Sequence, residues 1–279
     1  MESRITILCE NTISRSGLIG EHGFSLLIEL ENEKYLFDTG PGLSLPYNLK
    51  SLGKNLDGLD GIIISHGHYD HTGGLKWAIK KAAPVEVVAH PAIFSRHMVY
   101  NPDKPNEAPC FVGCPHAQRA LEELGAHFNF ISRTEKIASR LWFITGINRL
   151  PGQFPYDSRL VIAEQDHLVP DPIRDDASLL LECEGPPVLI LGCAHSGVLN
   201  ILDHIRDKMS TSKLRAILGG THLMFTSPKD IPRVIDKLEG FSIELIGVSH
   251  CTGFKAIIEL AKHFEDRFKM ASAGTTFVF

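Results

Sequence analysis

Short apolar runs alternate with amphipathic segments along most of this 279-residue chain. Apolar runs bounded by glycine and polar turns are typical of buried strands, and apolar positions that recur every three or four residues are typical of helices. Strands are expected at residues 5–8, 24–30, 34–37, 61–65, 85–89, 178–183, 188–191, 216–218 and 243–248, and helices at 44–52, 73–81, 198–209, 229–238 and 253–264. This alternation predicts an α/β fold in which helices cover the outer faces of two mixed sheets.

The pattern breaks down between about residues 91 and 172, where prolines and aromatic residues are interspersed. Loops of this length in a compact domain usually act as lids or binding segments. We therefore expect a single domain over residues 1–279, with a lid-like insertion at about 91–172 that forms one side of the substrate pocket. A purely structural insertion is the alternative.

The strongest chemical signal is His66-Gly67-His68-Tyr69-Asp70-His71, which directly follows an apolar strand. Neutral imidazoles and a carboxylate are ligands that zinc, iron and manganese accept, and glycine lets the backbone fold tightly around an ion. Because a strand presents alternate residues to one side, His66 and His68 can converge on one ion while Asp70 and His71 serve a second. The spacing predicts a metal site, and a solvated polar turn is the alternative.

Two histidines of the second half also follow predicted strands. His195 comes after residues 188–191, and His250 comes after residues 243–248. Because strand ends gather at one rim of a fold, both are expected beside the motif at 66–71, and an ordinary buried histidine is the alternative for each.

His222 also follows a short apolar strand and is expected at the edge of the pocket, where it orients the substrate or transfers a proton. A structural role or direct metal ligation is the alternative for His222. Asp38, in an Asp-Thr-Gly turn, is expected to hydrogen-bond a ligand histidine and fix its tautomer.

These segments resemble the metallo-β-lactamase-fold superfamily. The motif at 66–71 matches its signature, residues 35–40 resemble its strand ending in Asp-Thr-Gly, and residues 273–279 resemble its terminal strand. The resemblance implies a four-layer αββα sandwich with one or two divalent metal ions between two sheets. Within the superfamily the chain is most similar to the dihydropterin-transferase-like subgroup. The segments that carry this narrower resemblance are 10–12, 20–23, 192–197, 219–223 and 249–253.

The resemblance also implies a ligand assignment. One metal would be held by His66, His68 and His195, and the other by Asp70, His71 and His250. Many members carry a bridging aspartate directly after a glycine, where this chain has Cys193. Either His195 does that work, or the bridging ligand is absent, or Asp176 substitutes for it. Cys193, Asp176 and His222 thus stay open as additional ligands.

The implied reaction is hydrolysis of a phosphorylated or ester-type small molecule by a metal-activated water. Asp70 would orient the water and relay its proton, and His222 would hold or protonate the leaving oxygen. The alternative is a dihydropterin diphosphate-dependent transferase, in which the ions neutralise a diphosphate while an aromatic amine attacks. The metals would be zinc, iron or manganese, with magnesium possible for the transferase. A non-catalytic metal-bound sensor is the third hypothesis.

Composition fits this interpretation. A net charge of -5 and a pI near 6.3 indicate no basic surface for nucleic acid, and no apolar run approaches the roughly 18 residues of a membrane span. We expect a cytoplasmic enzyme with a small-molecule substrate, either phosphorylated or pterin-like; the pattern does not indicate an oligomeric state. Six scattered cysteines fit a reducing compartment. Cys110 and Cys114, with His116, are a possible further metal site that lacks a fourth partner.

Overall fold

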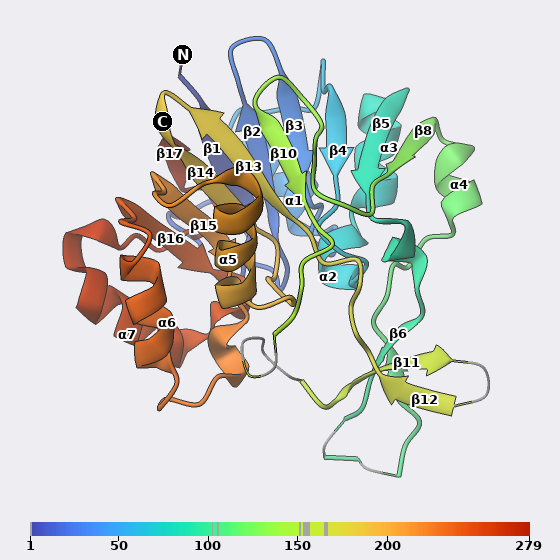
Figure 1. Cartoon of the computed structure of the whole chain (residues 1–279). Coiled ribbons are helices and arrows are strands. Elements are labelled where there is room, and N and C mark those ends of the chain that lie inside the picture. The colour runs from blue at the N-terminus through green and yellow to red at the C-terminus, as the bar shows by residue number, and fades with distance from the viewer. Residues whose placement is uncertain (1, 102, 105, 151, 153–156, 165–166) are drawn as a thin grey trace.

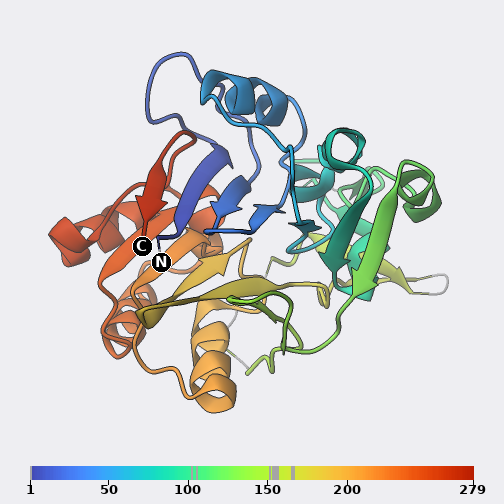
Figure 2. The same ribbon diagram turned by 90° about the horizontal axis from the view of Figure 1, so that it is seen from above.

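Two central sheets form the computed structural model, which describes residues 2–101, 103–104, 106–150, 152, 157–164 and 167–279. The first sheet has the order β17 (Thr276–Val278), β1 (Arg4–Cys9), β2 (Ser25–Glu29), β3 (Lys34–Phe37), β4 (Gly61–Ile63), β5 (Val85–Ala89) and β8 (Ala126–Phe130). The second has the order β16 (Leu245–Ser249), β15 (Ala216–Gly220), β14 (Gly185–Leu191), β13 (Ser178–Cys183), β10 (Leu141–Ile144) and β9 (Glu135–Lys136). Strands β1 and β17 pair antiparallel, so the two ends of the chain lie side by side (Figure 2).

Both faces of each sheet are buried, which explains why the strands are almost continuously apolar. In β14, Val188 and Ile190 belong to the core between the sheets, whereas Leu189 and Leu191 belong to the core under the outer helices. The same alternation places Ile63 between the sheets and Ile62 on the outer side of the first sheet.

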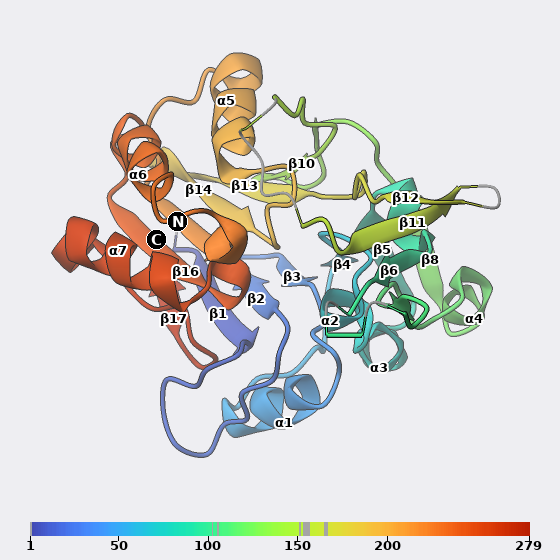
Figure 3. The same cartoon turned by 90° about the horizontal axis from the view of Figure 1, so that it is seen from below.

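Helices cover the two outer faces, as Figure 3 shows. Helices α1 (Ser44–Ser51), α3 (Leu75–Ala82) and α4 (Gln118–Glu122) pack on the first sheet, and α5 (Val198–Met209), α6 (Ile231–Glu239) and α7 (Phe254–Phe264) pack on the second. The predicted four-layer αββα arrangement is therefore confirmed. No helix in the described part of the chain combines the length and apolar character that crossing a membrane requires.

Parallel strands bring several chain segments to one edge of the molecule. Strands β3, β4 and β5 run parallel in the first sheet, and β14, β15 and β16 run parallel in the second. At the carboxyl end of β4 the chain enters the short helix α2 (Tyr69–Thr72), which Figure 1 shows at the lower edge of the sheets. The expected helix at 73–81 is thus preceded by a separate turn of helix and begins at Leu75.

The segment from 91 to 172 is more regular than its composition indicates. Strand β8 completes the first sheet and β9 and β10 complete the second, because Leu141 and Phe143 fill the core between the sheets. A small third sheet, β12 (His167–Pro170), β11 (Leu160–Glu164), β6 (His97–Val99) and β7 (Cys110–Phe111), projects below α2 in Figure 1. Residues 102, 105, 151, 153–156 and 165–166 of the expected insertion lie outside the described residues.

Candidate metal centre

The loop after β4 is shaped by close contact with neighbouring segments. A Cβ on Gly67 would collide with the carbonyl of Ile93, so only glycine fits between His66 and His68. The Gly67 amide donates to Asp175 at 2.6 Å, which fixes the turn. His66 and His71 are fully buried, and His68 and Asp70 are nearly so.

The first predicted ligand set comes together. The ligand atoms of His66, His68 and His195 lie within 4.8 Å of one another. His66 Nε2 and His68 Nδ1 are 3.0 Å apart, and the buried Nε2 of His195 has no hydrogen-bond partner. Two ligands of one zinc ion, each about 2.0–2.3 Å from it, lie about 3.5 Å apart, so this spacing fits a metal.

The second predicted set also comes together. The ligand atoms of Asp70, His71 and His250 lie within 4.8 Å of one another. The Nε2 atoms of His71 and His250 face each other at 3.3 Å, and Asp70 Oδ2 lies 3.5 Å from His250 Nε2. The two nitrogens can share a proton at this distance, and a metal ion that replaced this proton would find both ligands in place.

Hydrogen bonds from behind orient both histidines of the second set. His71 Nδ1 donates to Asp38 Oδ2 at 2.7 Å, which is the bond that the Asp-Thr-Gly turn predicts. His250 Nδ1 lies 3.0 Å from Asn11 Oδ1, and the His250 amide donates to Glu10 at 2.8 Å. With Nδ1 engaged in each ring, Nε2 is the atom that remains for a metal. The role of residues 10 and 11 was not apparent from their local sequence.

Asp176, the possible substitute for a bridging ligand, accepts hydrogen bonds from backbone amides instead. Its two carboxylate oxygens accept the amides of His195 at 3.0 Å and Ser196 at 2.7 Å. It belongs to none of the possible ligand groups among the described residues. Asp176 therefore holds the turn that presents His195.

Three further side chains join the cluster. Cys193 Sγ lies 3.2 Å from His71 Nε2, and Cys251 shares a ligand group with Cys193 and His250. His222 shares a ligand group with Cys193 and His195, and both of its buried ring nitrogens lack a hydrogen-bond partner. The predicted set of six ligands therefore lies within a larger group of possible donors.

Burial and neighbouring charges set the protonation of the centre. Burial lowers the pKa of His66 and His195 well below the usual range and that of His68 to about 4. Burial also opposes the charged forms of His71 and Asp70, but neighbouring groups of opposite charge outweigh it. The carboxylates of Asp38 and Asp70 raise the pKa of His71 to about 9, and His71 and His250 hold the pKa of Asp70 below its usual range. Three imidazoles are thus neutral near pH 7, as metal ligation requires.

His97 connects the third sheet to the metal loop and was missed by the sequence interpretation. Its Nδ1 lies 2.5 Å from Asp171 Oδ2, its Nε2 lies 3.5 Å from Asp175 Oδ2, and its ring contacts that of His68. All three groups are buried. Burial lowers the pKa of His97, but the two carboxylates outweigh it and raise the pKa to about 10.

We expect His97→Leu to lower the free energy of unfolding of the metal-free protein by about 3–5 kcal/mol, because it leaves buried carboxylates without a cation. Urea unfolding at pH 7 measures this, with the exposed His127→Leu as control. Because the pKa of His97 is higher in the folded state, about 10 against 6.5 for a free histidine, its contribution is full below pH 6.5 and is lost as the pH rises through 10. A loss below about 1 kcal/mol would show that the carboxylates find other partners.

A pocket of about 180 Å³ opens onto the centre. The donors His68, Asp70, His195, His222 and His250 line one part of it. The third sheet and its flanks supply much of the rest: Val99, Val112, Leu160 and Arg159, whose guanidinium lies 4.9 Å from the Phe225 ring centre.

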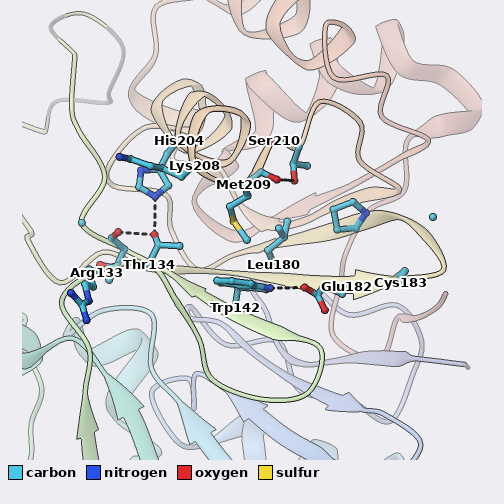
Figure 4. A pocket seen from close by; sticks show the side chains of 15 residues that line it. Arg133, Thr134, Trp142, Leu180, Glu182, Cys183, His204, Lys208, Met209 and Ser210 are labelled. Carbon is cyan, nitrogen blue, oxygen red and sulfur yellow. Dashed lines mark hydrogen bonds between the residues drawn. The ribbon is translucent and has the colours of Figure 1, made fainter.

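A larger cavity of about 950 Å³ lies apart from the metal-binding cluster. Figure 4 shows Trp142, whose indole donates to Glu182 at 2.7 Å, and His204, which bonds Thr134. None of the predicted ligands lines this cavity.

The possible cysteine site is not assembled. Cys114 donates to the His116 carbonyl, the His116 ring donates to the Gly73 carbonyl, and Cys110 is exposed. No ligand group among the described residues contains any of the three.

Known proteins are similar to this chain in sequence and in fold. Residues 18–105 match the family model of the metallo-beta-lactamase superfamily. The uncharacterized protein MJ0448 of Methanocaldococcus jannaschii is 30% identical over 92% of this chain and 94% of its own length. The 7,8-dihydropterin-6-methyl-4-(beta-D-ribofuranosyl)-aminobenzene-5'-phosphate synthase of the same archaeon is 28% identical over 91% of this chain and 88% of its own.

A solved structure is similar over nearly the whole length. The crystal structure of Tm1679, a metal-dependent hydrolase of the beta-lactamase superfamily, superposes with a TM-score of 0.84 at 25% identity, covering 99% of this chain and 98% of that one. Together with the four layers and the cluster at the strand ends, these similarities show that the chain belongs to the metallo-β-lactamase superfamily.

Proposed function

We propose that this protein hydrolyses a small phosphorylated or ester-type molecule in a metal-dependent reaction. One observation carries the proposal: two groups of metal donors, one around His66 and one around His71, lie side by side at the floor of a single pocket. The similarity to Tm1679, described as a metal-dependent hydrolase, supports it.

The donor set suits divalent ions of the first transition row. His66, His68 and His195 would hold one ion, and Asp70, His71 and His250 the other. Bound ions would supply Lewis acidity and a water that loses its proton near neutral pH.

The chain's own residues would orient the water, transfer protons and bind the substrate. Asp70, whose Oδ2 is 3.5 Å from both His22 Nε2 and His250 Nε2, is placed to orient the attacking water and accept its proton. His222 would hold or protonate the leaving oxygen, because its ring lines the pocket with free nitrogens. The guanidinium of Arg159, which also pairs with Asp157 at 2.7 Å, would donate to a phosphoryl or carboxyl group, and Val99 and Leu160 would exclude water.

A transferase is the second candidate, favoured by the archaeal synthase that matches most of the chain. In that reaction a diphosphate leaves a pterin-bearing carbon as an aromatic amine attacks it. Arg159 would attract the departing diphosphate, and the apolar wall would pack against the organic group.

A substrate screen on metal-loaded protein tests both. It would contain phosphomonoesters, phosphodiesters, a lactone, a thioester and a dihydropterin diphosphate with and without an aminobenzene acceptor. We expect turnover of a phosphorylated or ester substrate that is lost in Asp70→Ala. Product formation only with the amine acceptor would establish the transferase instead. Metal-loaded protein that turns over none of them would favour the sensor hypothesis.

We also expect up to two zinc, iron or manganese ions per chain after expression in supplemented medium, because nitrogen and carboxylate donors accept all three metals. Elemental analysis of the purified protein measures this. A content below about half an equivalent per chain would contradict the assignment of the donors as a metal site.

A further inference from the structure

We propose that the thiolate of Cys193 is a metal ligand shared by both metal positions. This inference rests on the metal dependence proposed above. It adds a soft anionic ligand to the six nitrogen and carboxylate donors of the two ligand sets.

The position of the sulfur carries the inference. Cys193 Sγ lies 3.2 Å from His71 Nε2 and shares ligand groups with His66, His195 and His250. It therefore neighbours two members of the first set and two of the second. No other side chain outside the two sets does so in the part of the chain that the structure describes.

The backbone is built to bring this sulfur to the centre. A Cβ on Gly192 would collide with the Ser65 side chain, so glycine lets the end of β14 lie against the loop after β4. Ala194 then adopts a left-handed conformation with φ 57°, which is unusual for a residue with a side chain. This turn allows both neighbours of Ala194, Cys193 and His195, to reach the cluster.

Charge balance supports a second anion. Asp70 is the only anionic side chain among the six predicted ligands, whereas two divalent ions carry a total charge of +4. Asp38, Glu10 and Asp176 are occupied by hydrogen bonds behind the ligands. A buried site of this kind is more stable with more anionic ligands, because buried charge needs compensation. On binding, the Cys193 thiol would lose its proton to solvent and the sulfur lone pairs would coordinate the ions, with no change of oxidation state.

The nearby Cys251 thiol makes different contacts. It is buried like Cys193, but it donates a hydrogen bond to the Cys193 carbonyl at 3.5 Å. It shares a ligand group with His250 but with no histidine of the first set. Cys251 thus provides a matched control: a second buried thiol in the same cluster whose position does not join the two sets.

The inference narrows the choice of metal. Thiolate favours zinc, iron and cobalt over manganese and magnesium, which prefer oxygen ligands. We therefore expect the centre to retain zinc or iron in competition with a large excess of magnesium.

Titration of the metal-free protein with Co²⁺ tests the ligand directly, independently of activity. In the parent protein, a thiolate-to-cobalt charge-transfer band should grow in the near ultraviolet through both the first and the second equivalent. Cys193→Ser should lose this band and bind Co²⁺ more weakly, by more than the 10- to 100-fold typical of residues behind a ligand. Cys251→Ser should keep the band.

Cys193→Asp tests whether misfolding, rather than removal of the sulfur, causes the loss of the band. Its carboxylate can also contact two ions, so we expect it to bind cobalt and keep a native circular dichroism spectrum without the sulfur band. A band that persists in Cys193→Ser and Cys193→Asp, or disappears only in Cys251→Ser, would overturn the inference. If the band saturates at one equivalent while a second ion binds, Cys193 contacts only one ion. This result would overturn the proposal that both metal positions share its thiolate. Cobalt binding without any sulfur band would overturn the inference but leave the proposed function intact, whereas absence of binding would contradict both.

Discussion

We expect Asp70→Ala and His250→Ala each to lose metal and most activity while the circular dichroism spectrum stays nearly native. Each substitution removes one of the three donors proposed for the second ion, so we expect metal affinity to fall by more than about 100-fold. The fold should persist because a chain of this length buries three apolar cores that involve no ligand. Elemental analysis, turnover and circular dichroism on the same preparations measure the three quantities.

The control is His263→Ala, since His263 is a partly exposed histidine that bonds Glu239 on the outer helices. It should leave metal content and turnover unchanged. Unfolding of either ligand variant at 25 °C would show that the centre is structural, and full metal content in Asp70→Ala would assign the second ion to other donors.

His222→Ala should retain near-normal metal content while turnover falls by roughly 10²- to 10⁴-fold, the usual effect of removing a positioned acid or base. His222 is buried, yet both ring nitrogens lack a hydrogen-bond partner, so we expect a bound molecule to supply one. Its ring lies beside Phe225, which also lines the pocket, and this position favours contact with substrate.

Metal stoichiometry measured beside turnover separates the alternatives for His222. Joint loss of metal and activity would make it a ligand, in agreement with its place near Cys193 and His195. Unchanged metal content and turnover would show that His222 has only a structural role.

Local sequence patterns were sufficient to predict which candidate ligands the fold brings together. The motif at 66–71 follows its strand directly, and His195 and His250 follow β14 and β16 closely, so strand ends located all of them. The Asp38 bond to His71 was predictable because a turn ends β3 beside the motif.

Contacts between distant segments could not be predicted in the same way. His97 meets Asp171 across 74 positions, and neither neighbourhood has a pattern that indicates a partner. Strand β10 is short and lies between polar segments, so its membership in the second sheet depends on pairing with β13 rather than on its own periodicity.

The hydrogen bond from the His250 amide to Glu10 joins residues 240 positions apart. A growing chain therefore contains the whole motif at 66–71 long before it contains the partners from the second sheet. Closing so long a loop is entropically unfavourable until the two sheets have packed together. The donor cluster is thus complete only after the two halves of the molecule have docked, so metal binding would report this docking.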